Sequence, residues 1–531
     1  MKRQHALIKT ILIFTLVHML IVQWPLVNQV LRMVDVTRMN GAYALFVIEL
    51  VQFCLLAGIL GLISLFSITL MRVVAGLVLI VDVVALYFMT GFGVIMNQEM
   101  IANILNTDGG EVSALIDWKI FAWGIIFGVL PAALLFRVKI RPHPYWHRSL
   151  IAPVAFGVLA IVLTLSPNTG KWIDKNGLEL GGRILPWSYV ANTVRYFDED
   201  HKRYMRAQEI LPDPTDPAPE NGLVVLVIGE SARSQNFAWY DYTRDTNPQT
   251  RAAGFRALPA SDACATATIG SVACLLSRRG REERMGLPEE PLPSYLTRQG
   301  VKTIVHVNNT GLPRIKVSDF VVGSQLKQIC SGDFCAERFE YTCSSGICDD
   351  IFPDGILLSG VKDIAQSALN EPTFLLLHMG GSHGPNYFQK YPQRFSTFEP
   401  VCTDKYLPMC DTEGLRNAYD NTLIYTDAVL AELASILSGV QGLDATILYT
   451  SDHGQSLGED GVYAHAAPLS SAPKYQLSIP LFIWQSDSAK REIVNPSVAA
   501  HDAIFHTILG EFGFTNGGVY RADRDIFAPA N

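Results

Sequence analysis

The chain has 531 residues, of which 49% are hydrophobic and 17% charged, and its formal net charge is −8. This negative balance argues against a nucleic acid as the partner, because nucleic-acid-binding proteins present basic surfaces to the phosphate backbone. The hydrophobic residues are unevenly spread: residues 6–166 consist mostly of long apolar runs, whereas the rest has the composition of a soluble domain.

Five apolar runs in the N-terminal part are long enough to cross a membrane. They are Ala6–Val27, Ala42–Phe66, Ile68–Thr90, Ile120–Phe136 and Leu150–Ser166. Each approaches or exceeds the roughly 17–25 residues that a bilayer-spanning helix needs. The first run lacks a small-residue cleavage site, so we interpret it as an uncleaved anchor and not as a signal peptide. We therefore predict a membrane domain of five transmembrane helices over residues 1–166.

Basic residues and cysteines predict the same orientation. Residues 1–3 and the loop 137–148 carry the basic residues that favour the cytoplasmic side. Five spans that start inside place the C-terminal part outside. Eight of the nine cysteines lie in that part at short spacings, as disulfides in an oxidising compartment do. We predict that neighbours pair: Cys264 with Cys274, Cys330 with Cys335, Cys343 with Cys348, and Cys402 with Cys410.

Residues 167–221 are predicted to bridge the two parts. The stretch Ile184–Phe197 mixes aromatic and apolar residues with polar ones, which fits a helix along the membrane surface or a packing helix of the soluble domain. The proline-rich run Leu211–Pro219 is a stiff linker. A folded domain is therefore predicted over residues 222–531.

Between the third and fourth apolar runs, Asn103, Thr107 and Glu111 recur at every fourth position. On a helix they would form one polar stripe. A stripe at the outer face of the membrane that the helices span could hold a lipid headgroup, although Gly109 and Gly110 interrupt the helical pattern.

Two strand-like runs of the soluble part end in side chains that bind metals. Leu223–Gly229 is followed by Glu230, and Ala445–Tyr449 leads to Asp452 and His453. The carboxyl ends of parallel strands are where α/β folds place their chemistry. Carboxylates and an imidazole suit zinc. A lone glutamate would more often cap the next helix, but the three together predict a metal site.

The turn between Cys264 and Cys274 contains three candidate hydroxyl nucleophiles, Thr266, Thr268 and Ser271. A hydroxyl is a poor nucleophile until a metal or a base lowers its pKa. The residues alone do not separate the three, and each fits an N-cap equally well. A metal site beside such a turn predicts metal-assisted phosphoryl or sulfuryl transfer.

The same reasoning assigns roles to three histidines. His378 falls within the strand-like run that begins at Phe374 and is interpreted as structural. His383, in a glycine-rich loop, and His465, in a loop beyond His453, are placed to meet a substrate or a second metal.

These motifs together resemble the phosphoethanolamine transferases that modify lipid A, which include the mobile colistin-resistance enzymes. The markers are Gly229–Arg233, Tyr242–Pro248, the Cys264–Cys274 loop, Ser382–Pro385 and Ser451–Gly454, followed by His465. The resemblance covers nearly the whole chain. It implies five spans, a bridging segment and an α/β periplasmic domain like that of alkaline phosphatase.

Carried over by position, the resemblance implies a role for each candidate residue. It makes Thr268 the nucleophile, and it assigns the catalytic zinc to Glu230, Thr268, Asp452 and His453. It places the phosphoethanolamine group or a second zinc at His383 and His465, and Asn309 is predicted to bind the substrate. It assigns the donor lipid to Asn103, Thr107 and Glu111.

The reaction implied by the resemblance has two half-steps. The hydroxyl of Thr268 attacks phosphatidylethanolamine and releases diacylglycerol, and the phosphoethanolamine then passes from the threonine to lipid A. Zinc (Zn²⁺) is the implied cofactor, and resistance to polymyxins is the implied consequence. The resemblance also implies a monomer in the inner membrane of a Gram-negative cell, with its N-terminus in the cytoplasm and its catalytic domain in the periplasm.

One departure and three alternatives stand beside this interpretation. The family usually has a lysine where this chain has Pro313, and Arg314 or Lys316 could supply the charge. A sulfatase would need Pro-x-Arg after its nucleophile, whereas Ala-Thr-Ala follows Cys264. Phosphoglycerol transfer, or transfer to another envelope glycan, is the enzymatic alternative. The alternative without enzymatic activity is a membrane-anchored scaffold with an inactive phosphatase-like fold.

Overall fold

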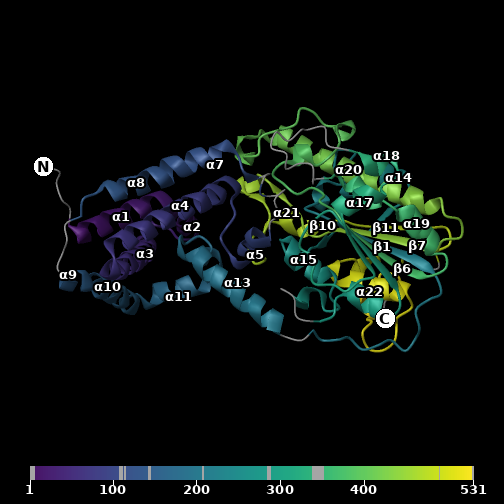
Figure 1. Cartoon of the computed structure of the whole chain (residues 1–531), viewed down its shortest axis with the longest axis horizontal. Helices are drawn as coiled ribbons and strands as arrows, with labels where there is room; N and C mark the ends of the chain where they lie inside the picture. Colours follow the sequence, from purple (N-terminus) through teal and green to yellow (C-terminus); the bar gives the residue numbers. More distant parts are fainter. Residues whose placement is uncertain are drawn as a thin grey trace. The chain divides into compact units, whose positions relative to one another are not determined.

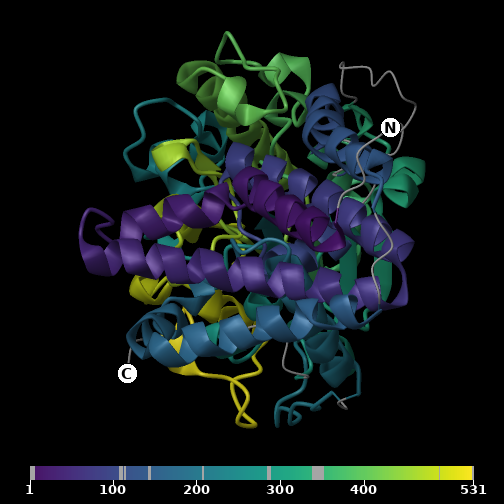
Figure 2. The same cartoon turned by 90° about the vertical axis from the view of Figure 1, so that its left-hand side faces the viewer.

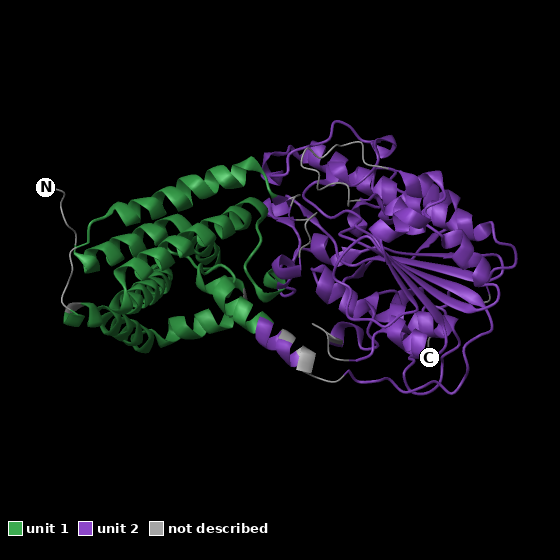
Figure 3. Cartoon of the chain, in the orientation of Figure 1, with its two compact units in different colours: residues 1–101, 116–196 green, residues 102–115, 197–531 purple. Residues whose placement is uncertain are grey.

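The computed structural model describes residues 6–106, 112, 115–140, 145–205, 208–283, 289–337, 352–489 and 491–528. The chain forms two compact units (Figure 3). The first comprises Met1–Ile101 and Ile116–Tyr196, and the second comprises Ala102–Leu115 and Phe197–Asn531. The domain boundaries drawn from the sequence, at residues 166 and 221, stay predictions.

The N-terminal part of the chain is helical. Its helices are α1 (Leu7–Val22), α2 (Trp24–Met33), α3 (Met39–Phe66), α4 (Ile68–Phe92), α5 (Gln98–Asn106), α7 (Trp118–Trp123), α8 (Leu130–Arg137), α9 (Tyr145–Ser149), α10 (Ile151–Leu165), α11 (Pro167–Lys175), α12 (Gly177–Gly181) and α13 (Trp187–Met205). A π-helical segment, Gly124–Val129, joins α7 to α8.

Three helical stretches of this part are long and apolar enough to cross a membrane: α3, α4 and Trp118–Arg137. The pairs α1–α2 and α10–α11 also qualify when each pair is taken together, although they bend by 62° and 88°. The described residues therefore provide three spans, or up to five if each bent pair is one span. Helices α1, α3 and α4 pack against one another, and α10 packs against α3 (Figures 1 and 2).

Small residues allow α3 and α10 to pack closely. A Cβ atom on Gly58 would lie 2.9 Å from the ring of Phe156. A Cβ atom on Gly61 would lie 2.6 Å from Ile151. Helices in a membrane associate largely through such close contacts, because lipid tails are as apolar as the side chains.

The second unit is built on a seven-stranded sheet with the order β2-β11-β7-β1-β6-β4-β5. The strands are β1 (Gly222–Gly229), β2 (Arg256–Ala257), β4 (Lys302–Val307), β5 (Asp319–Val322), β6 (Pro372–His378), β7 (Ala445–Ser451) and β11 (Leu481–Gln485). Strands β7, β1, β6, β4 and β5 are parallel to one another, whereas β11 runs antiparallel to both of its neighbours, β7 and β2. The central strands are rich in Val, Leu and Ile and are buried on both faces, as strands of a parallel sheet are.

Helices cover both faces of this sheet (Figure 1). They are α14 (Pro248–Ala252), α15 (Thr268–Leu275), α16 (Leu292–Arg298), α17 (Gly323–Ile329), α18 (Asp333–Ala336), α19 (Val361–Ser367), α20 (Thr412–Ser438), α21 (Lys474–Leu477) and α22 (His501–Glu511). The long helix α20 lies on one side, and α15 and α22 lie on the other, where they share an apolar core with the sheet. Two small antiparallel pairs, β3 (Ser261–Asp262) with β10 (Ser478–Ile479) and β8 (Ser456–Leu457) with β9 (Tyr463–Ala464), complete the unit. The predicted α/β architecture is confirmed.

Three of the four predicted disulfides are confirmed. The bonds join Cys264 to Cys274, Cys330 to Cys335, and Cys402 to Cys410. The predicted fourth bond, between Cys343 and Cys348, lies outside the described residues. Cys54, in α3, is a buried free thiol.

Candidate active site

Parallel pairing brings the predicted ligand residues to one edge of the sheet. Strand β1 pairs with β7 so that Gly229 lies opposite Ser451. The next residues are therefore Glu230 on one strand and Asp452 on the other. The backbone N–H of Asp452 donates to the carbonyl of Gly229 over 3.0 Å, which extends the pairing into the site.

The three predicted ligand side chains converge and are fully buried. The Nε2 atom of His453 lies 3.4 Å from Glu230 Oε1 and 3.3 Å from Asp452 Oδ2. Ligand atoms of all three lie within 4.8 Å of one another. This set of two carboxylates and one imidazole matches the donors that zinc prefers.

The structure distinguishes the three candidate hydroxyls. Thr268 is the first residue of α15, and its Oγ1 donates to Glu230 Oε2 over 3.1 Å and lies 3.4 Å from His453 Nε2. The hydroxyl of Thr266 donates to the carbonyl of Ala467, and that of Ser271 donates to the carbonyl of Ala265. Thr268 is also partly exposed, unlike the buried ligand set. Among the four predicted zinc ligands, Thr268 is therefore the one that solvent reaches.

The buried carboxylates lack enough positive charge around them. Burial, and secondly the charge of Asp452, raise the pKa of Glu230 to about 7. Burial raises the pKa of Asp452 to about 6. Among the described residues, none donates a well-aligned hydrogen bond to Asp452 Oδ2. A buried carboxylate oxygen without a donor is costly, so this site fits a bound cation.

Asn309, which was predicted to contact substrate, lies against the same carboxylate. Its Nδ2 donates to Glu230 Oε2 over 2.9 Å and lies 3.4 Å from His378 Nε2. His378 is fully buried, and burial lowers its pKa to about 3, so it is neutral. The backbone also passes close to the nucleophile here: a Cβ atom on Gly311, whose φ is +92°, would lie 3.1 Å from Thr268 Cγ2.

His383 and His465 also lie close to Glu230. Ligand atoms of Glu230, His383 and His465 form a second group within 4.8 Å. The ring of His465 is 4.3 Å from that of His453 and 5.2 Å from that of His383, measured between centroids. Burial lowers the pKa of His383 to about 4. The two histidines thus offer neutral nitrogen atoms beside the first ligand set.

Sequence reasoning missed two residues that hold this site. Gln455 is buried, and its Oε1 lies 2.9 Å from His465 Nδ1, while its Nε2 donates to the hydroxyl of Tyr387 over 2.6 Å. Ser231 has a positive φ of 56°, and its hydroxyl donates to Glu230 Oε1 over 2.7 Å. The available signal was their position: Ser231 lies inside the Gly229–Arg233 marker, and Gln455 directly follows the Ser451–Gly454 marker.

The predicted polar stripe of the N-terminal part is only partly described. Asn103 lies in α5 and is partly buried. Thr107 and Glu111 lie outside the described residues, so the stripe stays a prediction.

Comparison with known proteins covers both parts of the chain. Residues 223–514 match the sulfatase family, and residues 28–201 match the family described as phosphoethanolamine transferase EptA/EptB. The phosphoethanolamine transferase EptA of Helicobacter pylori is 34% identical over 488 residues, which cover 90% of this chain and 89% of that protein. The phosphatidylethanolamine transferase Mcr-1 of Escherichia coli is 29% identical over 473 residues, 85% of each chain.

A solved structure is similar over the full length. The integral membrane protein lipooligosaccharide phosphoethanolamine transferase A (EptA) of Neisseria meningitidis matches with a TM-score of 0.85 and 25% identity, and the match covers 100% of both chains. The predicted combination of membrane helices with an α/β catalytic domain is therefore confirmed as one known architecture.

Proposed function

This chain belongs to the EptA family of phosphoethanolamine transferases, with a C-terminal part of the sulfatase family, and we propose that it transfers phosphoethanolamine from phosphatidylethanolamine to lipid A through Thr268. Membership makes it an enzyme of the transferase class. The donor, the acceptor, the metal and the covalent step are the content of the proposal.

One observation carries the covalent step: the Thr268 hydroxyl donates to Glu230 Oε2 over 3.1 Å beside the buried cluster of Glu230, Asp452 and His453. Thr268 is partly exposed, so a phosphorus atom can reach its oxygen from the open side. The other two hydroxyls of the loop are engaged by backbone carbonyls. These contacts support Thr268 as the nucleophile.

Zinc fits the cluster by the chemistry of its donors. Glu230, Asp452 and His453 would hold the ion, with Thr268 at the open position. A bound zinc ion would supply Lewis-acid stabilisation of phosphoryl charge and a lower pKa for the threonine hydroxyl. Two observations on the described residues support this assignment: the pKa values of both buried carboxylates are raised, and Asp452 Oδ2 accepts no well-aligned hydrogen bond.

The chain's own residues would orient the Thr268 hydroxyl and assist transfer of the phosphoethanolamine group to and from it. Asn309 Nδ2 and Ser231 Oγ each donate to Glu230, which fixes the carboxylate that accepts the Thr268 hydrogen bond. As the Thr268 Oγ–P bond forms, the hydroxyl proton would pass to Glu230, and as the P–O bond to glycerol breaks, the same proton would pass to the leaving diacylglycerol oxygen. His383 and His465, both neutral, would present lone-pair nitrogens to the ammonium end of the phosphoethanolamine group or to a second zinc, because the Nδ1–H of His465 is already donated to Gln455 Oε1. A lipid A phosphate oxygen then attacks the same phosphorus and frees Thr268.

The donor and acceptor follow from the relatives and from the membrane helices. Mcr-1 is named for phosphatidylethanolamine, and the Neisseria protein is named for lipooligosaccharide. Both kinds of lipid remain in a membrane, and the N-terminal part provides three to five candidate spans. The added ammonium group would reduce the negative charge of lipid A, which supports resistance to cationic polymyxins as the consequence.

The proposed location is the inner membrane of a Gram-negative cell, with the protein acting as a monomer. Arg137 ends α8 and Lys139 follows it, and these basic residues favour the cytoplasmic side at that end. The confirmed disulfides of the second unit favour the oxidising periplasm for residues 222–531.

Mass spectrometry of lipid A tests the proposal. A polymyxin-sensitive Gram-negative strain would express the wild-type chain or the Thr268→Ala variant. We expect lipid A to gain one phosphoethanolamine only with the wild-type chain. Unmodified lipid A in cells with membrane-inserted wild-type protein would overturn the proposed acceptor, and modification by Thr268→Ala would overturn the proposed nucleophile.

A further inference from the structure

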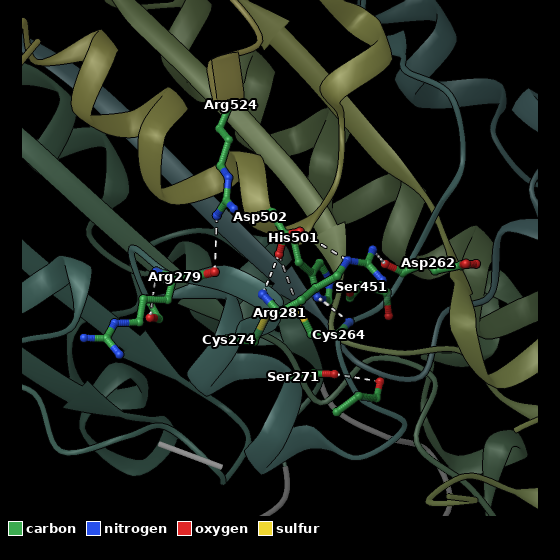
Figure 4. The surroundings of a disulfide bond; sticks show 12 residues. Asp262, Cys264, Ser271, Cys274, Arg279, Arg281, Ser451, His501, Asp502 and Arg524 are labelled. Carbon is green, nitrogen blue, oxygen red and sulfur yellow. Dashed lines mark hydrogen bonds and ion pairs between the residues drawn. A yellow bond between two sulfur atoms is a disulfide. The ribbon is translucent and has the colours of Figure 1, made fainter. Parts of the chain in front are cut away.

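His501, the first residue of α22, lies beside the Cys264–Cys274 disulfide (Figure 4). The side chain is fully buried. Its Nδ1 accepts from the backbone N–H of Cys264 over 3.3 Å, and its Nε2 donates to the carbonyl of Ser451 over 2.8 Å. Because an amide N–H only donates and a carbonyl only accepts, these partners fix one neutral tautomer of the ring.

The same surroundings exclude a metal-binding role for this histidine. Donor atoms of Cys264, Cys274 and His501 lie within 4.8 Å of one another, as metal ligands can. The two sulfur atoms are bonded to each other, however, and both ring nitrogens of His501 are used by the backbone. The imidazole is therefore a hydrogen-bonding bridge.

The two backbone groups joined by His501 belong to opposite parts of the active site. Cys264 begins the loop that carries Thr268, and Ser451 directly precedes Asp452 and His453. Resting on the proposed function, we propose that His501 is a positioning residue for phosphoethanolamine transfer: its ring sets the distance between the Thr268 hydroxyl and the metal-ligand cluster. The lowered pKa of His501, about 4 because of burial, keeps both bonds available at neutral pH.

The neighbouring residue strengthens the bridge. Asp502 Oδ1 accepts from the backbone N–H of Arg281 over 2.7 Å, and Oδ2 accepts from Arg281 Nε over 3.2 Å (Figure 4). The Arg281 guanidinium in turn donates to the carbonyl of Asp262 over 2.5 Å. The start of α22 therefore holds the segment before Cys264 as well as Cys264 itself.

The same helix contains a matched control. His506 is also fully buried, its Nδ1 accepts from the N–H of Arg521 over 3.2 Å, and its Nε2 donates to the carbonyl of Arg278 over 3.1 Å. Burial lowers its pKa to about 4 as well. The two histidines thus share helix, burial and bonding pattern, but His506 bonds to neither the Thr268 loop nor the end of β7.

The experiment compares His501→Leu and His501→Gln with His506→Leu and His506→Gln in the purified full-length, zinc-loaded chain. It measures kcat and KM for diacylglycerol release from phosphatidylethanolamine, together with the melting temperature. Leucine removes both hydrogen bonds, and glutamine keeps one donor and one acceptor on a flexible side chain. Because displacement of a reacting group by about 1 Å can cost about 100-fold in rate, we expect His501→Leu to lower kcat by about 100-fold and His501→Gln by about tenfold, with KM unchanged.

The melting temperatures of the His506 variants should fall by about as much as those of the His501 variants, whereas their kcat should equal that of the wild type. Equal kcat values for the two leucine variants would overturn the positioning role. If His501→Leu does not fold, the glutamine pair decides, and equal kcat for His501→Gln and His506→Gln would overturn it. A wild-type chain that releases no diacylglycerol would overturn the proposed function, and with it the inference, whereas an active wild type with an unaffected His501 series would overturn the inference alone.

Discussion

The two units both bury ionisable side chains, but with different charge balances. In the helical unit, His18 of α1 and Asp82 of α4 are fully buried and meet at 2.6 Å between Nε2 and Oδ2, one imidazole for one carboxylate. In the catalytic unit, the imidazole of His453 lies between two carboxylates, 3.4 Å from Glu230 and 3.3 Å from Asp452. The first group contains its own partner and serves to join two helices. The second has two carboxylates around one imidazole, which fits the cation that we propose for it.

The largest expected effect comes from the same substitution, Asp→Asn, made once in each of these two buried groups. Asp452→Asn should lose the bound zinc and lower kcat by at least about 100-fold, because it removes a ligand charge. Asp82→Asn is the matched control and should keep a full equivalent of zinc. Zinc content by atomic emission and transfer rate are the measurements. Full zinc content in Asp452→Asn would show that this carboxylate is not a ligand.

The sequence predicted the catalytic cluster because parallel strands bring their carboxyl ends together. Glu230, Asp452 and His453 each directly follow such a strand, so local pattern and topology agree. The disulfides of Cys264–Cys274, Cys330–Cys335 and Cys402–Cys410 are also local and followed from spacing.

Other features depend on long-range contacts or on bends that hydropathy does not show. The contact of His501 with Cys264 joins positions 237 residues apart, and a pattern of neighbours contains no trace of it. The residue pattern did not separate Thr268 from Thr266 and Ser271; the family resemblance assigned Thr268, and the partners of the three hydroxyls in the folded chain support that assignment. The first predicted span is bent by 62° between α1 and α2, where Pro25 lies at the start of the second helix.

In the helical unit, breaking the balanced pair should affect stability and leave the chemistry unchanged. His18→Leu leaves Asp82 buried without its partner, which typically costs about 3–5 kcal/mol. The double variant His18→Leu/Asp82→Leu should regain much of that loss, because two apolar side chains replace the pair. The measurement is thermal unfolding, in detergent, of the wild type, His18→Leu, Asp82→Leu and the double variant. Additive losses in the double variant would mean that the two side chains do not interact.

In the catalytic unit, removal of the metal should have a smaller effect on stability than breaking the membrane pair. A ligand present at 100 times its Kd stabilises the folded state by about 2.7 kcal/mol, so a chelator should lower the melting temperature accordingly. Asp452→Asn should melt at the same temperature with and without the chelator. If the chelator does not change the melting temperature of the wild type, the buried charges of Glu230 and Asp452 do not need a cation.

An intermediate case, Glu511 in α22, gives the smallest effect. It lies 3.4 Å from Arg491, which also binds Asp525 at 2.7 Å, so two carboxylates share one guanidinium. Burial raises the pKa of Glu511 from 4.5 to about 7. Between these values the folded chain binds the proton that the unfolded chain has released, so the free energy of unfolding falls as pH rises from about 4.5 to about 7.

Glu511→Gln should remove this part of the pH dependence, because the amide stays neutral and can still accept the hydrogen bond from the Thr446 hydroxyl. Relative to the wild type, we expect the variant to gain about 1 kcal/mol at pH 8 over pH 5, below the roughly 3 kcal/mol that the full shift would give. Urea unfolding at the two pH values measures the difference. The exposed Glu220→Gln serves as the control and should show none. If the free energy of unfolding of Glu511→Gln changes with pH as that of the wild type does, Arg491 fully compensates the charges of both Glu511 and Asp525. The two carboxylates would then have no surplus negative charge, although they share one guanidinium.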